Sequence, residues 1–231
     1  MKTAYLFDID GTLTPSRKVI DPEFKEWFLN FQKSHDVYLV TGSDYPKTLE
    51  QVGEEICNNS KLLFNCCGNE VRRGTEVVHL ADWTGTPELT AALEHELENS
   101  QFHIKTGRHI ETRTGLVNFS VVGRNANLQQ RHEYVVFDTA TSERTHIAQR
   151  LTDKFNDIEF TIAGETGIDI YPVGKDKSQV LTWVDADVTK FYGDMIVPGG
   201  NDWGIAQHAT ESYRVTDWTH TKKILEEIKD M

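Results

Sequence analysis

The most constraining feature of this sequence is an apolar run that leads directly into two closely spaced carboxylates and a glycine. The run is Tyr5–Phe7, and Asp8, Asp10 and Gly11 follow it. Continuous apolar runs are typical of buried strands in parallel sheets, and ligands bind beyond the carboxyl ends of such strands. Because side chains alternate along an extended backbone, Asp8 and Asp10 are expected to point the same way and to repel each other. A divalent metal with oxygen ligands relieves such repulsion, so the pattern predicts a metal-dependent site.

The segments that follow this strand alternate between helix and strand. Apolar strands are expected at 37–40 and 62–66, and a helix over roughly 46–57 separates them. An earlier helix is expected to begin at Asp21, a suitable N-cap, with Pro22 in its first turn. Alternating strands and helices are typical of an α/β fold, so this part of the chain predicts a doubly wound parallel sheet.

The pattern changes at 82–87, which is a turn-forming stretch. Short strands separated by glycine turns follow, and these are typical of an antiparallel sheet. Strands are expected at 102–105, 110–113, 116–121, 158–162 and 168–171, with helices over about 87–99 and 141–155. Beyond Pro172 the first pattern resumes, with helices at 178–184 and 219–229 and strands at 190–194 and 212–215. We therefore predict an α/β core formed by residues 1–82 and 174–231, with an inserted α+β domain over 83–173.

The charge balance limits the ligands that this chain can attract. Its 24 basic and 36 acidic residues give a net charge of −12. Such a field disfavours nucleic acid and anionic membranes as partners, and a phosphate ligand would need a local cluster of Arg or Lys. Three cysteines, Cys57, Cys66 and Cys67, have no metal-binding spacing and suit a reducing compartment. With neither a signal peptide nor a membrane span expected, we predict a cytoplasmic protein.

Further polar residues follow the other predicted core strands. Thr41 follows the second strand, Lys177 opens a helix, and Asp194 and Asp202 follow a later strand. Taken singly, each has an ordinary explanation as a helix cap, a surface charge or a turn. Their common place at one sheet edge instead predicts phosphoryl transfer, with a carboxylate nucleophile and cations that neutralise phosphoryl oxygens. Asp8 is the expected nucleophile, and Asp10 is expected to give and take a proton.

These elements resemble the four motifs of the haloacid dehalogenase superfamily. In detail, Phe7–Arg17 resembles the first motif of eukaryotic-type phosphomannomutases, and Gly42–Tyr45 resembles the second. Gly193–Asp202, which ends in Pro-Gly-Gly-Asn-Asp, resembles the fourth and is the most specific. The resemblance runs over nearly the whole chain. It implies a Rossmannoid core of the haloacid dehalogenase type with an inserted α+β cap domain of the C2b type.

The resemblance also implies roles for individual residues. A mutase must grip the non-reacting phosphate of its substrate, and guanidinium forks suit that task because they bind phosphate bidentately. Without the resemblance, the arginines of the inserted domain would be expected to be solvated surface charges. The implied catalytic residues are Asp8, Asp10, Thr41 and Lys177; the substrate-binding residues are Arg17, Ser43, Arg113, Arg124, Arg131, Gly167 and Asp169; and the Mg²⁺ ligands are Asp8, Asp10, Asp194 and Asp202.

Two activities of this superfamily compete. The leading hypothesis is a Mg²⁺-dependent mutase that interconverts hexose 6-phosphate and hexose 1-phosphate, with mannose or glucose as the sugar. It would use an aspartyl-phosphate enzyme and a hexose bisphosphate, which also serves as activator. The alternative is a phosphatase of a phosphosugar or a related small ester. Gly167, where the family has serine, and Thr41, where it has glycine, lean toward the phosphatase.

Other expectations concern partners and catalytic competence. The expected ligand is a phosphorylated hexose, and the resemblance allows a homodimer formed through the cap. A non-catalytic binding protein on the same fold is a third hypothesis. It is disfavoured because both Asp8 and Asp10 are present.

Overall fold

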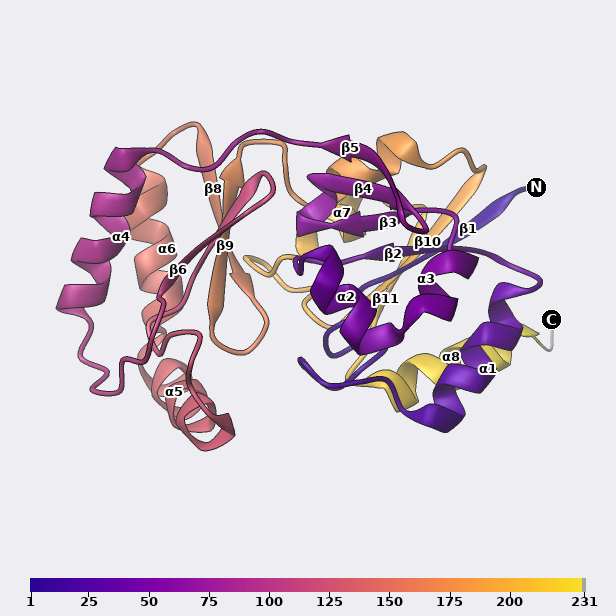
Figure 1. Ribbon diagram of the computed structural model, residues 1–231, viewed down its shortest axis with the longest axis horizontal. Helices are drawn as coiled ribbons and strands as arrows, with labels where there is room; N and C mark the ends of the chain where they lie inside the picture. Colours follow the sequence, from indigo (N-terminus) through magenta and orange to yellow (C-terminus); the bar gives the residue numbers. More distant parts are fainter. Residues whose placement is uncertain (230–231) are drawn as a thin grey trace.

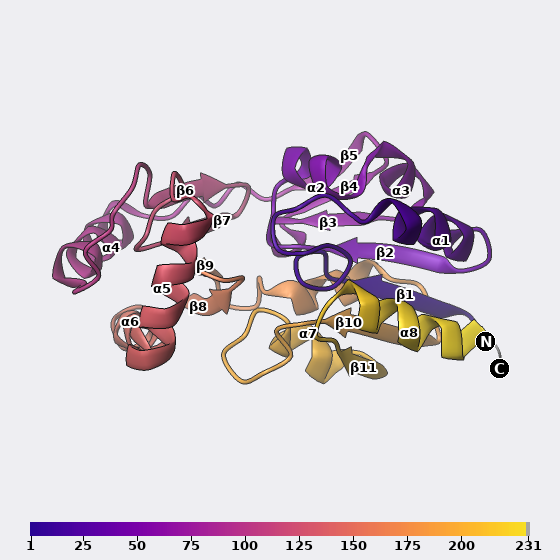
Figure 2. The same cartoon turned by 90° about the horizontal axis from the view of Figure 1, so that it is seen from below.

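The computed structural model describes residues 1–229, and their strands form two separate sheets (Figure 1). The larger sheet has seven strands in the order β11-β10-β1-β2-β3-β4-β5. The two halves of the molecule lie side by side in both orthogonal views (Figures 1 and 2). The strands of the larger sheet are β1 (Thr3–Phe7), β2 (Asp36–Val40), β3 (Leu63–Asn65), β4 (Glu70–Arg73), β5 (Glu76–Leu80), β10 (Val188–Gly193) and β11 (Glu211–Arg214).

Helices cover both faces of the larger sheet. Phe7 and Leu39 pack with Phe28 of α1 (Pro22–Gln32), Ile56 of α3 (Glu54–Asn59) and Leu225 of α8 (Trp218–Lys229) on one face. On the other face, the alternate side chains of β1 and β2 pack against the 3₁₀ helix η2 (Lys177–Trp183) and α7 (Trp203–His208). β1 pairs in parallel with β2 and β10 and is buried on both faces, which explains its continuous apolar run.

Local capping explains where the first helices begin and end. The Asp21 carboxylate accepts hydrogen bonds from the N–H groups of Glu23 and Phe24, so the predicted N-cap of α1 is confirmed. The prediction of one helix over 46–57 is wrong, because Gly53 separates two helices. It is the C-cap of α2 (Tyr45–Val52) and the N-cap of α3. Gly53 has a φ of 83°, which interrupts a right-handed helix and favours glycine.

The smaller sheet has four antiparallel strands in the order β6-β7-β9-β8. The helices α4 and α6 lie on the side of this sheet away from the larger sheet (Figure 1). Phe119, Tyr134 and Ile147 belong to the apolar core between the sheet and its helices. The elements are β6 (Ile110–Arg113), β7 (Leu116–Phe119), β8 (Ile158–Ala163), β9 (Gly167–Pro172), α4 (Pro87–Asn99), α5 (Leu128–Thr141) and α6 (Glu143–Lys154).

The sequence prediction fails at three elements. The strand expected at 102–105 is wrong, since this stretch runs as irregular chain that buries Phe102 against Tyr134. The β4–β5 hairpin was not predicted, because every residue of β5 is exposed and gives no apolar alternation. α5 was also missed, because only Arg131 and Tyr134 of this helix are buried.

The predicted fold class is confirmed: a mixed, mainly parallel sheet with helices on both faces carries a separate antiparallel α+β domain. All strands of the larger sheet fall within 1–82 and 174–231, and all strands of the smaller sheet fall within 83–173. The domain boundaries at 82/83 and 173/174 stay a prediction with which this distribution of strands agrees. Within residues 1–229, no helix combines the length and the apolar composition needed to cross a membrane.

Candidate active site

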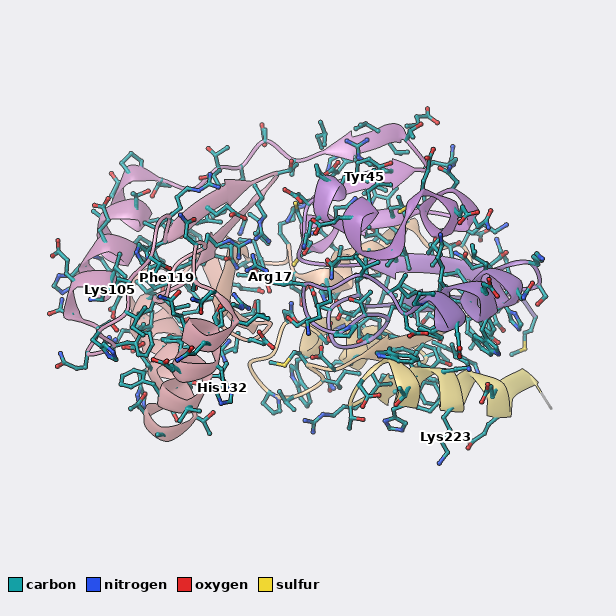
Figure 3. The ribbon with its side chains drawn as sticks, turned by 60° about the horizontal axis from the view of Figure 1, so that its bottom comes forward. Arg17, Tyr45, Lys105, Phe119, His132 and Lys223 are labelled. Atoms are coloured by element: carbon teal, nitrogen blue, oxygen red, sulfur yellow. The ribbon has the colours of Figure 1, made fainter. Side chains whose placement is uncertain are left out.

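A cleft of about 600 Å³ lies between the two sheets and is lined by residues of both. It opens at the carboxyl ends of β1, β2 and β10, where ligands bind in open α/β sheets. Arg17 occupies the space between the two halves of the molecule in Figure 3. The predicted site residues that line the cleft are Asp8, Asp10, Arg17, Thr41, Ser43, Arg113, Arg124, Arg131, Gly167, Asp169 and Asp194.

Lys177 lies beneath the cleft floor and joins two carboxylates. Its Nζ donates to Oδ1 of Asp8 at 2.6 Å and to Oδ1 of Asp202 at 2.7 Å. All three side chains are almost wholly buried, so the ammonium is oriented by these two partners rather than by water. Among residues 1–229, the one hydrogen bond to Oδ2 of Asp8 comes from the Thr12 hydroxyl and is long, at 3.4 Å. This arrangement leaves Oδ2 as the oxygen of Asp8 that can attack phosphorus.

Three carboxylates form a group that can hold a divalent cation. Oxygens of Asp8, Asp194 and Asp202 lie within 4.8 Å of one another. Burial and the nearby charge of Asp202 raise the pKa of Asp194 to about 7, and burial also raises the pKa of Asp8 well above its usual value. Repulsion of this kind is relieved by a hard cation with oxygen ligands, so the donor set suits Mg²⁺. Gly11 has a φ of 78°, and a Cβ there would collide with the Asp194 carboxylate.

The Asp10 carboxylate lies outside this group of three carboxylates, and the role of Asp10 as a metal ligand stays a prediction. Oδ1 of Asp10 accepts hydrogen bonds from the Arg17 backbone N–H at 2.5 Å and from Gln51 Nε2 at 2.9 Å. The strand ends at Phe7, so the alternation that was expected to align Asp8 and Asp10 does not continue through the turn. The Asp10 side chain still lines the cleft, where it can exchange a proton with a bound ligand.

Thr41 and Ser43 lie at the end of β2, next to Asp8. The Ser43 N–H donates to the Thr41 hydroxyl oxygen at 3.0 Å, which leaves the Thr41 O–H free to donate into the cleft. The Thr41 backbone is fixed by hydrogen bonds to Phe64 and Cys67. These contacts hold a hydroxyl donor at the sheet edge, as phosphoryl oxygens require.

Five arginines line the cleft, of which Arg108 is largely exposed and the other four were predicted. Arg17 comes from the core, whereas Arg113, Arg124 and Arg131 come from the inserted domain. Burial and the proximity of the other three arginines lower the pKa of Arg17 to about 10. Four guanidinium groups that repel one another make a local anion site in a chain of net charge −12. These side chains are therefore not simple solvated surface charges.

Two acids that were not predicted from the sequence hold these arginines. Glu111 accepts from Arg113 Nε at 2.6 Å and from Arg124 Nε at 2.9 Å, while Glu165 accepts from Arg131 at 3.0 Å. Glu111 lies two residues before Arg113 on β6, and residues at this spacing share one face of a strand. That spacing is the sequence signal that could have revealed Glu111.

Asp169 and Gly167 lie on β9 beside another missed residue, Asn118 of β7. Asn118 is paired with Asp169 in the sheet, and its amide donates to Asp169 Oδ1 at 2.8 Å. A Cβ at Gly167 would lie 2.8 Å from that amide nitrogen. The absence of a serine at 167 thus leaves room for the Asn118–Asp169 hydrogen bond.

Direct contacts join the inserted domain to the core around the cleft. Arg113 Nη1 donates to the Gly42 carbonyl at 2.8 Å. The Ile162 N–H donates to Gly199 O at 2.9 Å, and the Asn201 N–H donates to Ile162 O at 3.1 Å. The structure therefore shows the inserted domain in contact with the core, an arrangement that can restrict water at Asp8.

Solved structures with this fold are haloacid dehalogenase-like proteins. A haloacid dehalogenase-like hydrolase from Bacteroides thetaiotaomicron aligns with a TM-score of 0.59 at 15% identity, over 99% of this chain and 100% of that one. An IMP-nucleotidase of Plasmodium falciparum aligns with a TM-score of 0.67 at 14% identity, over 99% of this chain and 67% of that one. At such identities the likeness shows the fold alone.

Sequence comparisons narrow the assignment to one family. The family model for eukaryotic phosphomannomutase matches residues 24–231. "Phosphomannomutase 1" of Dictyostelium discoideum is 33% identical, over 98% of this chain and 96% of that protein. The phosphomannomutase of Saccharomyces cerevisiae is 31% identical over 98% of this chain and 94% of its own length. The chain belongs to the eukaryotic phosphomannomutase family.

Proposed function

We propose that this protein interconverts hexose 6-phosphate and hexose 1-phosphate, with mannose as the principal sugar, through an aspartyl-phosphate enzyme. The observation that carries the proposal is the opposition of two sites across one cleft. Asp8 and Lys177 form a phosphoryl-transfer site on the core, and four arginines form an anion site facing it. The cleft volume of about 600 Å³ is within the range of ligand pockets in proteins. Family membership supports the same activity.

Asp8 becomes phosphorylated when its Oδ2 attacks one phosphorus of a hexose bisphosphate. A bond forms between Asp8 and phosphorus, the bond from phosphorus to the sugar oxygen breaks, and Asp10 gives that oxygen a proton. Lys177 stays on Oδ1 and neutralises charge, and the Thr41 hydroxyl donates to a phosphoryl oxygen. In the return step Asp10 takes a proton from a sugar hydroxyl, which attacks the aspartyl phosphate. In each turnover this second step comes first: the hydroxyl of a hexose monophosphate takes the phosphate from Asp8 and becomes a hexose bisphosphate, which then phosphorylates Asp8 again through its other phosphate and leaves as the isomer. Added hexose bisphosphate primes Asp8 in the same way and so acts as the activator.

Mg²⁺ is the cofactor that the donor set suits, with Asp8, Asp194 and Asp202 as its carboxylate ligands. When bound, it would offset the negative charge of these acids and of the transferring phosphoryl group. The carboxylate of Asp10 is assigned to proton transfer, with its Oδ1 held by Arg17 and Gln51, and its role as a further Mg²⁺ ligand stays a prediction.

The inserted domain is what favours a mutase over a phosphatase on this fold. Arg113, Arg124 and Arg131 can hold the non-reacting phosphate, while Asp169 and Ser43 line the wall that would contact the sugar hydroxyls. Contacts at Gly42 and Ile162 seat this domain on the core, and exclusion of water protects an aspartyl phosphate from hydrolysis. Formation of a homodimer through the inserted domain stays a prediction of the family resemblance.

The direct test is to incubate the protein with mannose 1-phosphate, Mg²⁺ and a trace of hexose bisphosphate. Separation of the products should show mannose 6-phosphate as the main product and little free phosphate. Asp8→Asn should form neither product. Release of inorganic phosphate as the main product would overturn the proposal in favour of a sugar phosphatase.

A further inference from the structure

A buried glutamine outside all predicted site residues contacts the carboxylate of Asp10. Gln51, near the end of α2, is fully buried. Its Nε2 donates to Oδ1 of Asp10 at 2.9 Å and to the Thr14 hydroxyl at 3.1 Å. Its Oε1 has no hydrogen-bond partner among the residues that the structure describes. The Gln51 side chain is therefore oriented by the two hydrogen bonds that its Nε2 donates, and one of these goes to the active-site residue Asp10.

The two donors to Asp10 act on the same oxygen. The Arg17 backbone N–H and the Gln51 amide both contact Oδ1, while Oδ2 accepts no hydrogen bond within residues 1–229. The Gln51 carbonyl also accepts the Ile20 N–H at 2.8 Å, which ties the end of α2 to the chain that follows the Asp10 turn. The orientation of Asp10 is thus set by a packed helix as well as by its own turn. Such fixation matters because small errors in the placement of a catalytic group are costly in rate.

We propose that Gln51 is a positioning residue that holds Asp10 by Oδ1 and presents Oδ2 as the oxygen that carries the proton. This inference rests on the proposed role of Asp10. When the bond from Asp8 to phosphorus forms and the bond from phosphorus to the sugar oxygen breaks, the proton moves from Oδ2 of Asp10 to that oxygen. In the return step, the proton of the attacking hydroxyl moves back to Oδ2. Gln51 itself exchanges no proton, and its amide acts on the reaction through its hydrogen bond to Asp10.

A second glutamine provides a matched control for the loss of a buried amide. Gln32, on α1, is also buried, and its Nε2 likewise donates twice, to Ile56 O and to the Ser60 hydroxyl, both at 3.1 Å. Its Oε1 also has no partner among the described residues, and Gln32 does not line the cleft. Gln32→Met and Gln51→Met therefore remove the same group from similar surroundings, and only the second change reaches Asp10.

The test compares phosphoenzyme formation from two phosphate donors in single turnovers. A hexose bisphosphate has an alkoxide leaving group that must receive a proton, whereas 2,4-dinitrophenyl phosphate releases a stable anion that needs none. Gln51→Met should slow phosphorylation by the hexose bisphosphate roughly tenfold to a hundredfold, as expected for a misplaced catalytic group. Its rate with the dinitrophenyl ester should stay within about threefold of the wild type, because an activated ester bypasses general acid catalysis. Gln32→Met should leave both rates unchanged.

Equal losses with both donors in Gln51→Met would overturn the inference, because Gln51 would then support only the fold. Unchanged rates with both donors would overturn it as well. Asp10→Asn, tested in parallel, separates this inference from the proposed role of Asp10. If Asp10→Asn also slows phosphorylation by both donors equally, the proton-transfer role of Asp10 is itself refuted. Should Gln51→Met not fold, Gln51→Asn keeps an amide but withdraws it by one methylene. The same dependence on the donor is then expected of Gln51→Asn, and its absence would refute the positioning role.

Discussion

The proposal that arginines of the inserted domain hold the non-reacting phosphate is tested most sharply by the removal of Arg124. Two of its guanidinium nitrogens contact Glu111, and its Nη1 is 3.4 Å from Asn118 Oδ1, too long for a strong hydrogen bond. Part of the guanidinium thus stays available to a phosphate in the cleft. Glu111 would keep its contact with Arg113 at 2.6 Å in Arg124→Ala, so no buried carboxylate is left unpaired. We therefore expect the variant to fold.

The size of the expected effect follows from the lost contact. A hydrogen bond to a charged group is worth about 1.5–3 kcal/mol, and about 1.4 kcal/mol corresponds to a factor of ten. Arg124→Ala should lower kcat/KM for mannose 1-phosphate roughly tenfold to a hundredfold. A small aryl phosphate has no second phosphate to hold, so its hydrolysis should scarcely change.

The assay measures conversion of mannose 1-phosphate and hydrolysis of the aryl phosphate in parallel. A second arginine of the inserted domain serves as the control. Arg150 of α6 also belongs to the inserted domain and is paired with a glutamate, Glu96, at 2.5 Å, but it does not line the cleft. Arg150→Ala should leave both activities at the wild-type level. If Arg124→Ala reduced both activities equally, Arg124 would be supporting the fold or the seating of the inserted domain. The reasoning that assigns it to the non-reacting phosphate would then be refuted.

Three further predictions concern the core carboxylates. Mg²⁺ at a hundredfold excess over its dissociation constant should stabilise the fold by about 2.7 kcal/mol, and a thermal melt that is identical in chelator and in Mg²⁺ would contradict the metal site. Without divalent metal, the free energy of unfolding should fall as the pH rises from about 4 to about 7, because the raised pKa of Asp194 means that the folded state binds the extra proton in this window. Asp194→Asn should flatten that dependence in denaturant titrations, and an unchanged slope would refute the assignment. Finally, Asp8→Asn should abolish labelling by a hexose bisphosphate, because an amide does not attack phosphorus, whereas Asp10→Asn should only slow it; equal labelling of the two variants would argue against these separate roles.

Local sequence determined much of the core and its chemistry. β1 is apolar on both sides because it is buried on both faces, and that property is visible in the sequence without any partner. Asp21 and Pro22 begin α1 through local hydrogen bonding and a fixed φ. The residues after β1, β2 and β10 were expected at one sheet edge, because parallel strands bring their carboxyl ends together. Asp8, Thr41 and Asp194 do line one cleft there.

Tertiary structure decided which of these residues work together. The sequence predicted that the side chains of Asp8 and Asp10 would point the same way, but the chain leaves the strand at Phe7 and the Asp10 carboxylate turns to Arg17 and Gln51. Alternation is a rule of extended chain and carries no information beyond the last strand residue.

The contacts that hold the cleft residues join segments that are far apart in the chain. Gln51 is 41 residues from Asp10, and Asn118 is 51 residues from Asp169. No local pattern marks such pairs, because periodicity and capping depend on neighbours within a few residues of one another. The sequence by itself determined most of the strands, the change of pattern at the insertion and the kinds of chemical group at the sheet edge. Tertiary packing within the core and within the inserted domain decided which groups are paired, which are buried and which oxygens of Asp8 and Asp10 are free to react.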